Sequence, residues 1–302
     1  MSRIVSSCSR ARKMVFVGLS ISLFFAGSFF WTAELFAAPR DYSNGAYKGS
    51  VAGHASKSHE GLRYVYVEVT PGKKELLEEI RRNSHNVSAP KFTKLIDGKH
   101  PAVVRIDVEG AGNVVYHGSG TLVAVSEEKG IIITNWHVIR DGIGKCTVRF
   151  PDGLVAKATI LKTDKTWDLA ALSIARPNVR PVKLSGRIPK IGDALTVAGY
   201  GGGTYRQSSG RMLQYCAPGM TEPEDIIEVT TAARNGDSGG PIFAQDGTLA
   251  GVLFGSISGT TNGSHAGRVR RFLQSVLVEA PYASYEVDEP RISRQSGPSP
   301  KF

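Results

Sequence analysis

Short runs of valine, isoleucine and leucine, separated by glycine-containing turns, repeat along the chain from about residue 98 onward. They restrict the fold more than any other feature. The runs recur about every 8–15 residues, the spacing of short strands joined by tight turns. They cover residues 102–108, 120–125, 131–134, 146–150, 154–161, 169–174, 194–200, 210–215, 225–230, 241–244 and 249–254. This pattern predicts an all-β domain, built as an antiparallel sandwich or barrel.

One helix is expected after the last strand. Residues 266–277 place apolar side chains on a single helical stripe, at Val269, Phe272, Leu273, Val276 and Leu277. The stripe predicts a C-terminal helix packed on the β domain. The polar segment 281–302 contains four prolines and is expected to be a disordered tail.

Composition and charge exclude several classes of protein. Hydrophobic residues make up 41% of the chain and charged residues 21%, as in a globular protein rather than a disordered one. The formal net charge is +10, which favours attraction to acidic surfaces. Because no basic stripe with interleaved aromatic residues is present, nucleic acid is not predicted as a partner.

The first 38 residues have the order of an export signal. A positively charged start precedes an apolar run over 14–31, and small residues follow at Ala37 and Ala38. This order predicts a signal peptide cleaved near Ala37 or Ala38. The apolar run is also long enough to span a bilayer, so an uncleaved signal anchor remains open. Either way, we expect an exported protein, periplasmic or secreted, with a membrane tether in the second case.

Residues 39–96 form an N-terminal extension that differs from the strand-rich part. Residues 63–69 alternate as in a strand, and Pro71 opens a segment with Leu76, Leu77 and Ile80 on one helical face. A short helix ending near residue 83 is therefore predicted. Two alternatives remain: a surface helix packed on the main domain, and a regulatory or pro-segment.

The cysteines and histidines suggest little metal chemistry. Cys8 lies in the export signal, which leaves Cys146 and Cys216 as a possible disulfide in an oxidising compartment. The seven histidines are scattered, without a Cys/His cluster or an i,i+4 pair, so no metal site is predicted.

The strongest chemical signal is the segment 236–241, Gly-Asp-Ser-Gly-Gly-Pro. A nucleophilic serine needs close approach by substrate, and glycines on both sides allow it. The N–H groups of Gly236 and Ser238 are the expected donors to a developing oxyanion. The alternative is a simple glycine-rich turn between two strands.

Two other segments carry the groups that such a serine needs. His137 follows the apolar run 131–133, and a serine hydroxyl is a weak nucleophile until a neutral imidazole accepts its proton. Asp168 is flanked by apolar residues, and a buried carboxylate needs a partner such as that imidazole. The alternatives are a structural histidine and an ordinary solvated aspartate.

The chain order His137, Asp168, Ser238 and the motifs around these residues resemble the trypsin/chymotrypsin-like serine proteases. The catalytic domain of the HtrA (Deg) type is the most similar. The likeness rests on TNWHVI around His137, WDLAALSI around Asp168, TTAARNGDSGGPIFAQDGTLAGV around Ser238, and IGDALTVAGYGGG at 191–203. It extends over residues 97–280, which we take as the protease domain.

The resemblance implies two packed six-stranded antiparallel β-barrels, with His137 and Asp168 in the first and Ser238 in the second. Asp168 would orient His137, which would deprotonate Ser238 and later protonate the leaving amine. No cofactor is implied.

The sequence departs from the family in two respects. Too few residues follow Ser238 for the remaining strands, a helix and a PDZ domain, so regulation by a PDZ domain is not expected. Secreted trypsins also pair a new N-terminus with the aspartate before the serine, and no such cleavage site is evident here. Asp237 therefore needs another partner, and Arg234 is the candidate.

Similarity to the family also indicates a substrate pocket. Ala232, six residues before the serine, would form its floor with Ala233 beside it, and Phe254 and Gly255 would form a wall. Because no carboxylate is present to pair with a basic side chain, a small or medium apolar P1 residue is expected.

We therefore expect an exported serine endopeptidase acting on protein or peptide substrates. Two alternatives are a catalytically inactive, protease-like binding protein and a serine esterase. The oligomeric state cannot be predicted.

Overall fold

The computed structural model describes residues 54–278 except 60–61, 68–70, 93 and 258. The predicted export signal (1–38), Cys8 and the predicted tail (281–302) lie outside the described residues. In the part of the chain that is described, no helix is both long and apolar enough to cross a membrane.

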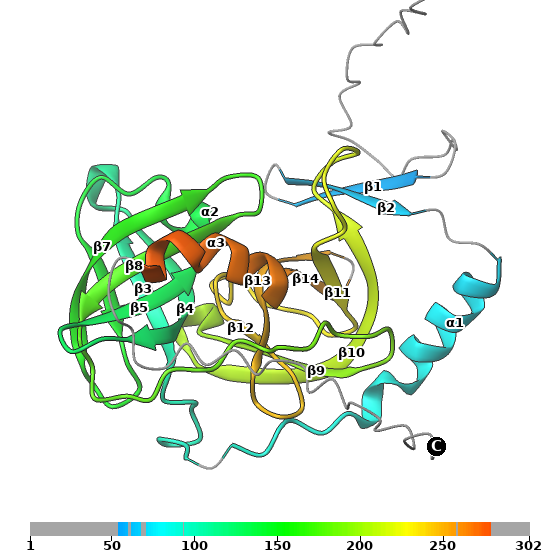
Figure 1. Cartoon of the computed structure of the whole chain (residues 1–302), viewed down its shortest axis with the longest axis horizontal. Coiled ribbons are helices and arrows are strands. Elements are labelled where there is room, and N and C mark those ends of the chain that lie inside the picture. The colour runs from blue at the N-terminus through cyan, green and yellow to red at the C-terminus, as the bar shows by residue number, and fades with distance from the viewer. Residues whose placement is uncertain (1–53, 60–61, 68–70, 93, 258, 279–302) are drawn as a thin grey trace, which may run out of the picture. The chain divides into compact units, whose positions relative to one another are not determined.

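Six antiparallel strands close into a first barrel, in the order β3-β4-β5-β8-β7-β6 (Figure 1). They are β3 (Val103–Glu109), β4 (Val115–Val125), β5 (Lys129–Thr134), β6 (Cys146–Arg149), β7 (Val155–Asp164) and β8 (Leu169–Ala175). Their β-branched residues suit a pleated, half-buried surface. The apolar residues that fill the core are fully buried, among them Ile106, Leu122, Ile132 and Leu172. Gly153 forms the turn before β7 with φ of 91°.

A second antiparallel barrel has the order β9-β10-β11-β14-β13-β12 and is closed because β12 also pairs with β9. Its strands are β9 (Ala194–Gly199), β10 (Arg206–Ala217), β11 (Ile226–Val229), β12 (Pro241–Phe243), β13 (Leu249–Ile257) and β14 (Thr260–His265). The C-terminal helix α3 (Ala266–Val278) follows. The predicted double barrel with a C-terminal helix is therefore confirmed.

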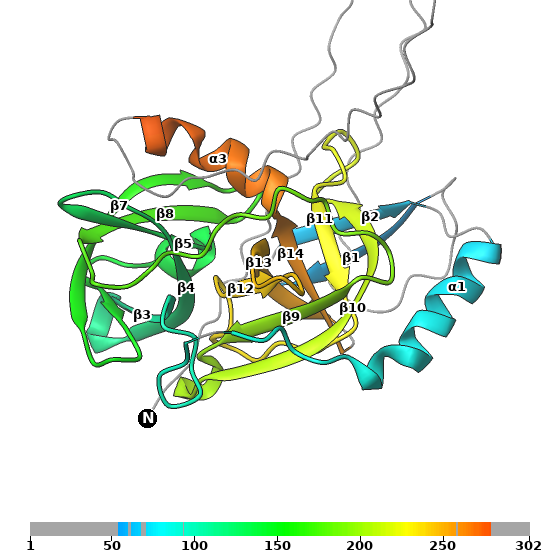
Figure 2. The same ribbon diagram turned by 60° about the horizontal axis from the view of Figure 1, so that its bottom comes forward.

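Short helical turns connect the strands. They are α2 (Trp136–Ile139), η1 (Asn83–Asn86), η2 (Ala111–Asn113) and η3 (Gly201–Gly203). Helix α3 lies over both barrels: in Figure 2 it runs above β7 and β8, and the Lys162 ammonium of β7 donates to the Phe272 carbonyl of α3 at 2.8 Å.

Part of the N-terminal extension belongs structurally to the second barrel. The hairpin of β1 (His54–His59) and β2 (Leu62–Val67) joins the edge of β10, where Tyr66 pairs with Cys216. The predicted helix is present as α1 (Pro71–Arg82), and its buried Leu77 and Ile80 pack against Leu213. These contacts favour the alternative of a helix packed on the main domain.

The possible disulfide between Cys146 and Cys216 is not formed. Cys146 lies on β6 of the first barrel and Cys216 on β10 of the second, and both thiols are buried. Burial raises the pKa of the Cys146 thiol to about 11. The sequence suggested a disulfide only because two cysteines remain in a chain expected to be exported. An even number of cysteines does not by itself bring two strands of different barrels together.

Candidate active site

Residues of both barrels line one open pocket of about 520 Å³. The first barrel contributes His137 and Val138, and the second contributes Gly236 and Ser238. The three predicted catalytic residues come together here, because Asp168 lies directly behind His137.

His137 is held by two bonds to the same carboxylate. Its backbone N–H donates to Asp168 Oδ1 at 2.8 Å, and its Nδ1 lies 2.5 Å from Asp168 Oδ2. The imidazole stands on the short helix α2, which begins directly after β5 and Asn135. An Nδ1–H bound to a carboxylate leaves Nε2 as the basic nitrogen of a neutral imidazole.

Asp168 is 1% exposed and has a positive φ of 49°, which is uncommon for a residue with a side chain. Asn135 stabilises this conformation by donating from Nδ2 to the Asp168 carbonyl at 2.7 Å. The buried carboxylate itself is satisfied by the two His137 N–H groups. The turn therefore presents Asp168 to one residue, His137.

Ser238 lies in the loop between β11 and β12. Ser238 is half-buried and lines the pocket, and its hydroxyl donates a long, 3.4 Å bond to the Phe254 carbonyl. Such a weak bond leaves the hydroxyl available to another acceptor. The flanking Gly236 and Gly239 have positive φ values of 93° and 85°, a conformation that glycine adopts without strain.

The backbone of this loop leaves two donors open. The N–H groups of Asp237 and Gly239 donate to carbonyls within the fold. Those of Gly236 and Ser238, the two predicted oxyanion donors, bond to no acceptor among the residues that the structure describes. Exposed, unpaired N–H groups beside a serine hydroxyl can stabilise negative charge on a substrate oxygen.

Asp237 has the partner proposed from the sequence. It is 3% exposed, and Arg234 binds it through its backbone N–H (2.7 Å) and its guanidinium (3.0 Å to Oδ1). Gly201 of η3 adds a third donor, with N–H to Oδ1 at 2.6 Å. The prediction that Arg234 is a partner of Asp237 is confirmed.

Ser119 is a functional residue that the sequence analysis missed. It lies fully buried on β4, and its N–H donates to the Ser238 carbonyl while its hydroxyl donates to the Gly236 carbonyl, both at 2.7 Å. A residue of the first barrel thus holds the serine loop of the second. The signal was the Gly118-Ser119-Gly120 segment, three small residues directly before the apolar end of a strand.

The predicted substrate-pocket residues are placed differently from one another. Ala233 and Gly255 line the pocket beside Ser238. Ala232 is exposed and is not among the lining residues, and the Phe254 side chain is 1% exposed within the core. Tyr116 and His117 of β4 also line the pocket, and no motif had indicated them.

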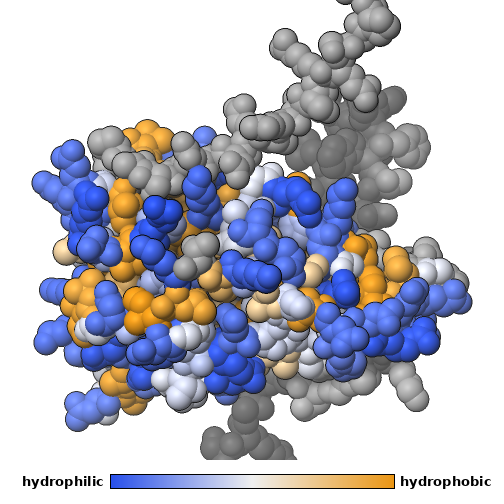
Figure 3. Space-filling view, turned by 90° about the horizontal axis from the view of Figure 1, so that it is seen from below, coloured by the Kyte–Doolittle hydropathy of each residue, from blue (hydrophilic) through white to orange (hydrophobic). Residues whose placement is uncertain are grey.

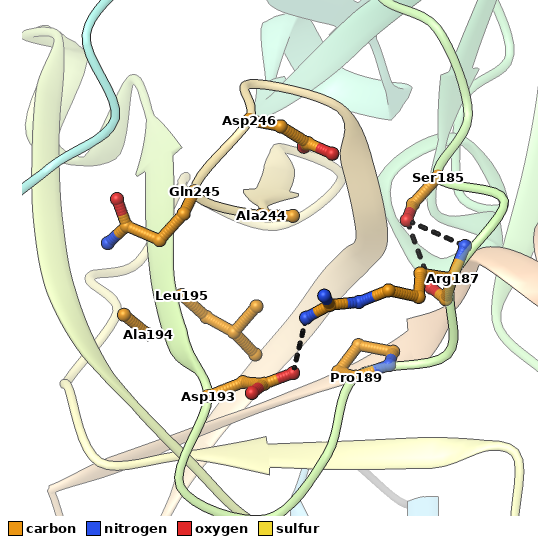
Figure 4. Close-up of a pocket in the computed structure, with 9 residues that line it drawn as sticks. All are labelled: Ser185, Arg187, Pro189, Asp193, Ala194, Leu195, Ala244, Gln245 and Asp246. Carbon is orange, nitrogen blue, oxygen red and sulfur yellow. Dashed lines mark hydrogen bonds and ion pairs between the residues drawn. The ribbon is translucent and has the colours of Figure 1, made fainter. Parts of the chain in front are cut away.

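A second, smaller pocket of about 180 Å³ offers no comparable chemistry (Figure 4). Its serine, Ser185, donates to the Arg187 carbonyl at 2.9 Å and accepts from the Arg187 N–H, so its hydroxyl serves the turn. Arg187 forms an ion pair with Asp193 at 3.2 Å across the pocket.

On the face seen in Figure 3, hydrophilic side chains surround separate apolar areas. Within the described residues, no group of three or more His, Cys, Asp or Glu side chains could hold a metal ion.

The fold is a chymotrypsin-like double barrel, and residues of both barrels line the pocket. Residues 118–252 match the family described as a trypsin-like peptidase domain. The resemblance predicted from the motifs is confirmed at this level.

Particular relatives are serine proteases of bacteria. The chain is 29% identical over 145 residues to "Serine protease Do-like HtrB" of Bacillus subtilis (strain 168), covering 44% of this chain and 31% of that protein. It is 28% identical over 158 residues to "Probable periplasmic serine protease do/HhoA-like" of Haemophilus influenzae, covering 50% and 33%. The chain thus spans about a third of the length of these relatives.

Solved structures share the fold. The structure titled "Crystal structure of Rv3671c protease from M. tuberculosis, active form" has a TM-score of 0.52 and 22% identity, covering 65% of this chain and 90% of that one. The serine endoprotease from Yersinia pestis has a TM-score of 0.50 and 23% identity, covering 59% and 64%.

Proposed function

We propose that this protein is an exported serine endopeptidase in which Ser238 is the nucleophile, His137 the general base and Asp168 the residue that orients it. One observation carries the proposal. The His137 imidazole, bound through Nδ1 to the buried Asp168, lines the same pocket as the partly exposed Ser238 hydroxyl.

The mechanism follows from these positions. His137 Nε2 accepts the Ser238 hydroxyl proton as Oγ attacks the substrate carbonyl carbon. The N–H groups of Gly236 and Ser238 donate to the oxygen that becomes negative. Asp168 stabilises the imidazolium, which then protonates the leaving amine. Water then takes the place of the amine. His137 accepts its proton as it attacks the acyl carbon and returns a proton to Ser238 Oγ as the acyl group leaves.

We further propose a small or medium apolar P1 residue. Ala233 and Gly255 line the pocket next to Ser238, and neither side chain bears a charge. A peptide library varied at P1 tests this: cleavage after Ala, Val or Leu is expected, and a clear preference for Arg or Lys contradicts it.

Export is the second part of the proposal. The sequence order in residues 1–38 supports it, as does the word "periplasmic" in the name of the Haemophilus influenzae relative. N-terminal sequencing of the exported protein distinguishes a cleaved signal peptide from an anchor. An N-terminus at Met1 in a membrane fraction indicates the anchor, and one near residue 38 indicates cleavage.

Covalent labelling tests the catalytic proposal. A fluorophosphonate probe should label the wild-type protein and fail to label Ser238→Ala. Ser126→Ala serves as the matched control, because its hydroxyl lies in the β4–β5 turn and bonds to Lys129. Casein hydrolysis separates the alternatives: cleavage of esters alone indicates an esterase, and absence of both labelling and cleavage indicates a binding protein.

A further inference from the structure

The second barrel reaches behind Asp168 and touches the residue before it. The Ser264 hydroxyl, at the end of β14 and fully buried, donates to the Trp167 carbonyl at 2.9 Å. The two residues are 97 positions apart in the chain and belong to different barrels. The main chain entering Asp168 is therefore bound by a group from the other barrel.

Helix α3 adds a second contact at the same place. The Arg268 guanidinium carbon lies 3.8 Å from the centre of the Trp167 indole, which is 5% exposed. A cation stacked on an indole face and shielded from water is a favourable contact. It covers the ring on the side of α3.

Arg268 is itself fixed by a carboxylate. Its Nε and Nη2 bind Asp225 Oδ2 at 3.0 and 2.5 Å, and Asp225 also accepts from His265 Nε2 at 2.8 Å and from Arg271. Only 18% of the Arg268 side chain is exposed. A planar guanidinium held on one side by a carboxylate and on the other by an indole has little freedom to move.

The Asp168 turn needs this support because of its backbone conformation. A residue with a side chain at positive φ is strained and persists only where its surroundings hold it. Asn135 holds the carbonyl that follows, whereas Ser264 and Arg268 hold the residue that precedes. Release of either side would let the carboxylate rotate away from the two His137 N–H groups.

We propose that Ser264 and Arg268 are positioning residues for the catalytic carboxylate, through which the second barrel holds the Trp167–Asp168 turn of the first. The proposal rests on the function proposed above. Neither residue lines the pocket of Ser238, so both act through Trp167 and not on the substrate.

The kinetic test compares arginines that share one carboxylate. Arg268→Met should lower kcat about tenfold for a peptide substrate and leave KM within twofold. Arg271→Met is the matched control, because Arg271 binds Asp225 but is 54% exposed, and its kcat should stay within twofold of wild type. Arg268→Lys retains a cation without the planar fork and should restore kcat in part.

A spectroscopic readout separates positioning from general destabilisation. The short Nδ1–H bond of His137 to Asp168 should give a low-field proton resonance in the full-length protein, and this resonance should move or broaden in Arg268→Met but not in Arg271→Met. Ser264→Ala removes one hydrogen bond and should act in the same direction if Arg268→Met does not fold.

The outcomes are distinct. Equal kcat values and an unchanged resonance in Arg268→Met and Arg271→Met overturn the positioning proposal. A raised KM with unchanged kcat in Arg268→Met overturns it as well. If the wild type is not labelled by fluorophosphonate while the resonance still responds to Arg268→Met, the proposed function fails and the positioning role stands.

Discussion

Two carboxylates in this molecule each bind one histidine and two arginines, but in different places. Asp107 lies on the outer face of β3 with Arg105, Arg149 and His117, whereas Asp225 lies where the second barrel meets the first. Both carboxylates are 13% exposed. Their histidines differ, with His117 49% and His265 6% exposed.

The comparison shows that the same set of charged groups has a different structural role on the outer face and at the contact between the barrels. Around each carboxyl, burial raises the pKa, but hydrogen bonds from Arg149, Arg105 and His117, or from His265, Arg271 and Arg268, outweigh it and hold the pKa below its usual value. On the outer face solvent screens the partners. At the contact between the barrels, the bonds to Asp225 hold Arg268 against Trp167.

A glycine at the barrel contact should tolerate change far less than one outside it. A Cβ on Gly239 would lie 2.1 Å from the Ser119 carbonyl oxygen, whereas a Cβ on Gly153 meets nothing within 4 Å. Both have positive φ, so only the contact differs. We expect Gly239→Ala to cost more than about 4 kcal/mol and Gly153→Ala about 1 kcal/mol in denaturant unfolding. Similar losses would contradict this comparison.

The next largest changes in the free energy of unfolding are expected when the two carboxylates are replaced. Asp225→Asn leaves Arg268 and His265 without their anion at the barrel contact and should lower the free energy of unfolding by about 3 kcal/mol. Asp107→Asn leaves more exposed partners and should cost about 1 kcal/mol or less. Urea titrations of both variants measure the difference. An equal loss of unfolding free energy would show that the location of the carboxylate has no effect.

A histidine without such a carboxylate should make the protein acid-sensitive. Burial lowers the pKa of His100 to about 4, and the ring packs against Phe92 and Phe243. Because the folded value lies below the unfolded value of about 6.5, its contribution is complete above that pH and is lost as pH falls toward 4.

The expected loss for His100 is about 2 kcal/mol between pH 7 and pH 5. His100→Asn keeps an acceptor for the Ala102 N–H and removes the titration, so its stability should change less over this range. Burial lowers the pKa of His265 too, but its bond to Asp225 opposes the shift, so a weaker effect is expected there. Parallel pH profiles for wild type and His100→Asn would refute the assignment.

The smallest effect is expected at the exposed histidine. His117→Gln retains a polar group beside Asp107 and should change the free energy of unfolding by less than about 0.5 kcal/mol. Thermal unfolding at pH 7 measures it. A change as large as that of Asp225→Asn would place the Asp107 cluster among the main stabilising contacts.

Most of the strands and the helices α1 and α3 could be predicted from the sequence, because alternation and helical periodicity are local signals. The segment 236–241 also pointed to Ser238, since a serine among three glycines has a chemical reason. The Cys146–Cys216 disulfide, which the sequence left open, is not formed, and the two cysteines lie in different barrels. The pairing of β2 with β10 had no local signal at all.

The sequence by itself determined an all-β domain and the residue types that His137, Asp168 and Ser238 supply, and its resemblance to a known family implied the two barrels. Only the tertiary structure decided how these residues are held: Ser119 of the first barrel binds the serine loop of the second, and Ser264 of the second barrel and Arg268 of α3 bind the turn of Asp168 in the first. The physical reason is distance along the chain. Periodicity reports which face of a strand is buried, but it contains no record of which distant residue will lie against that face.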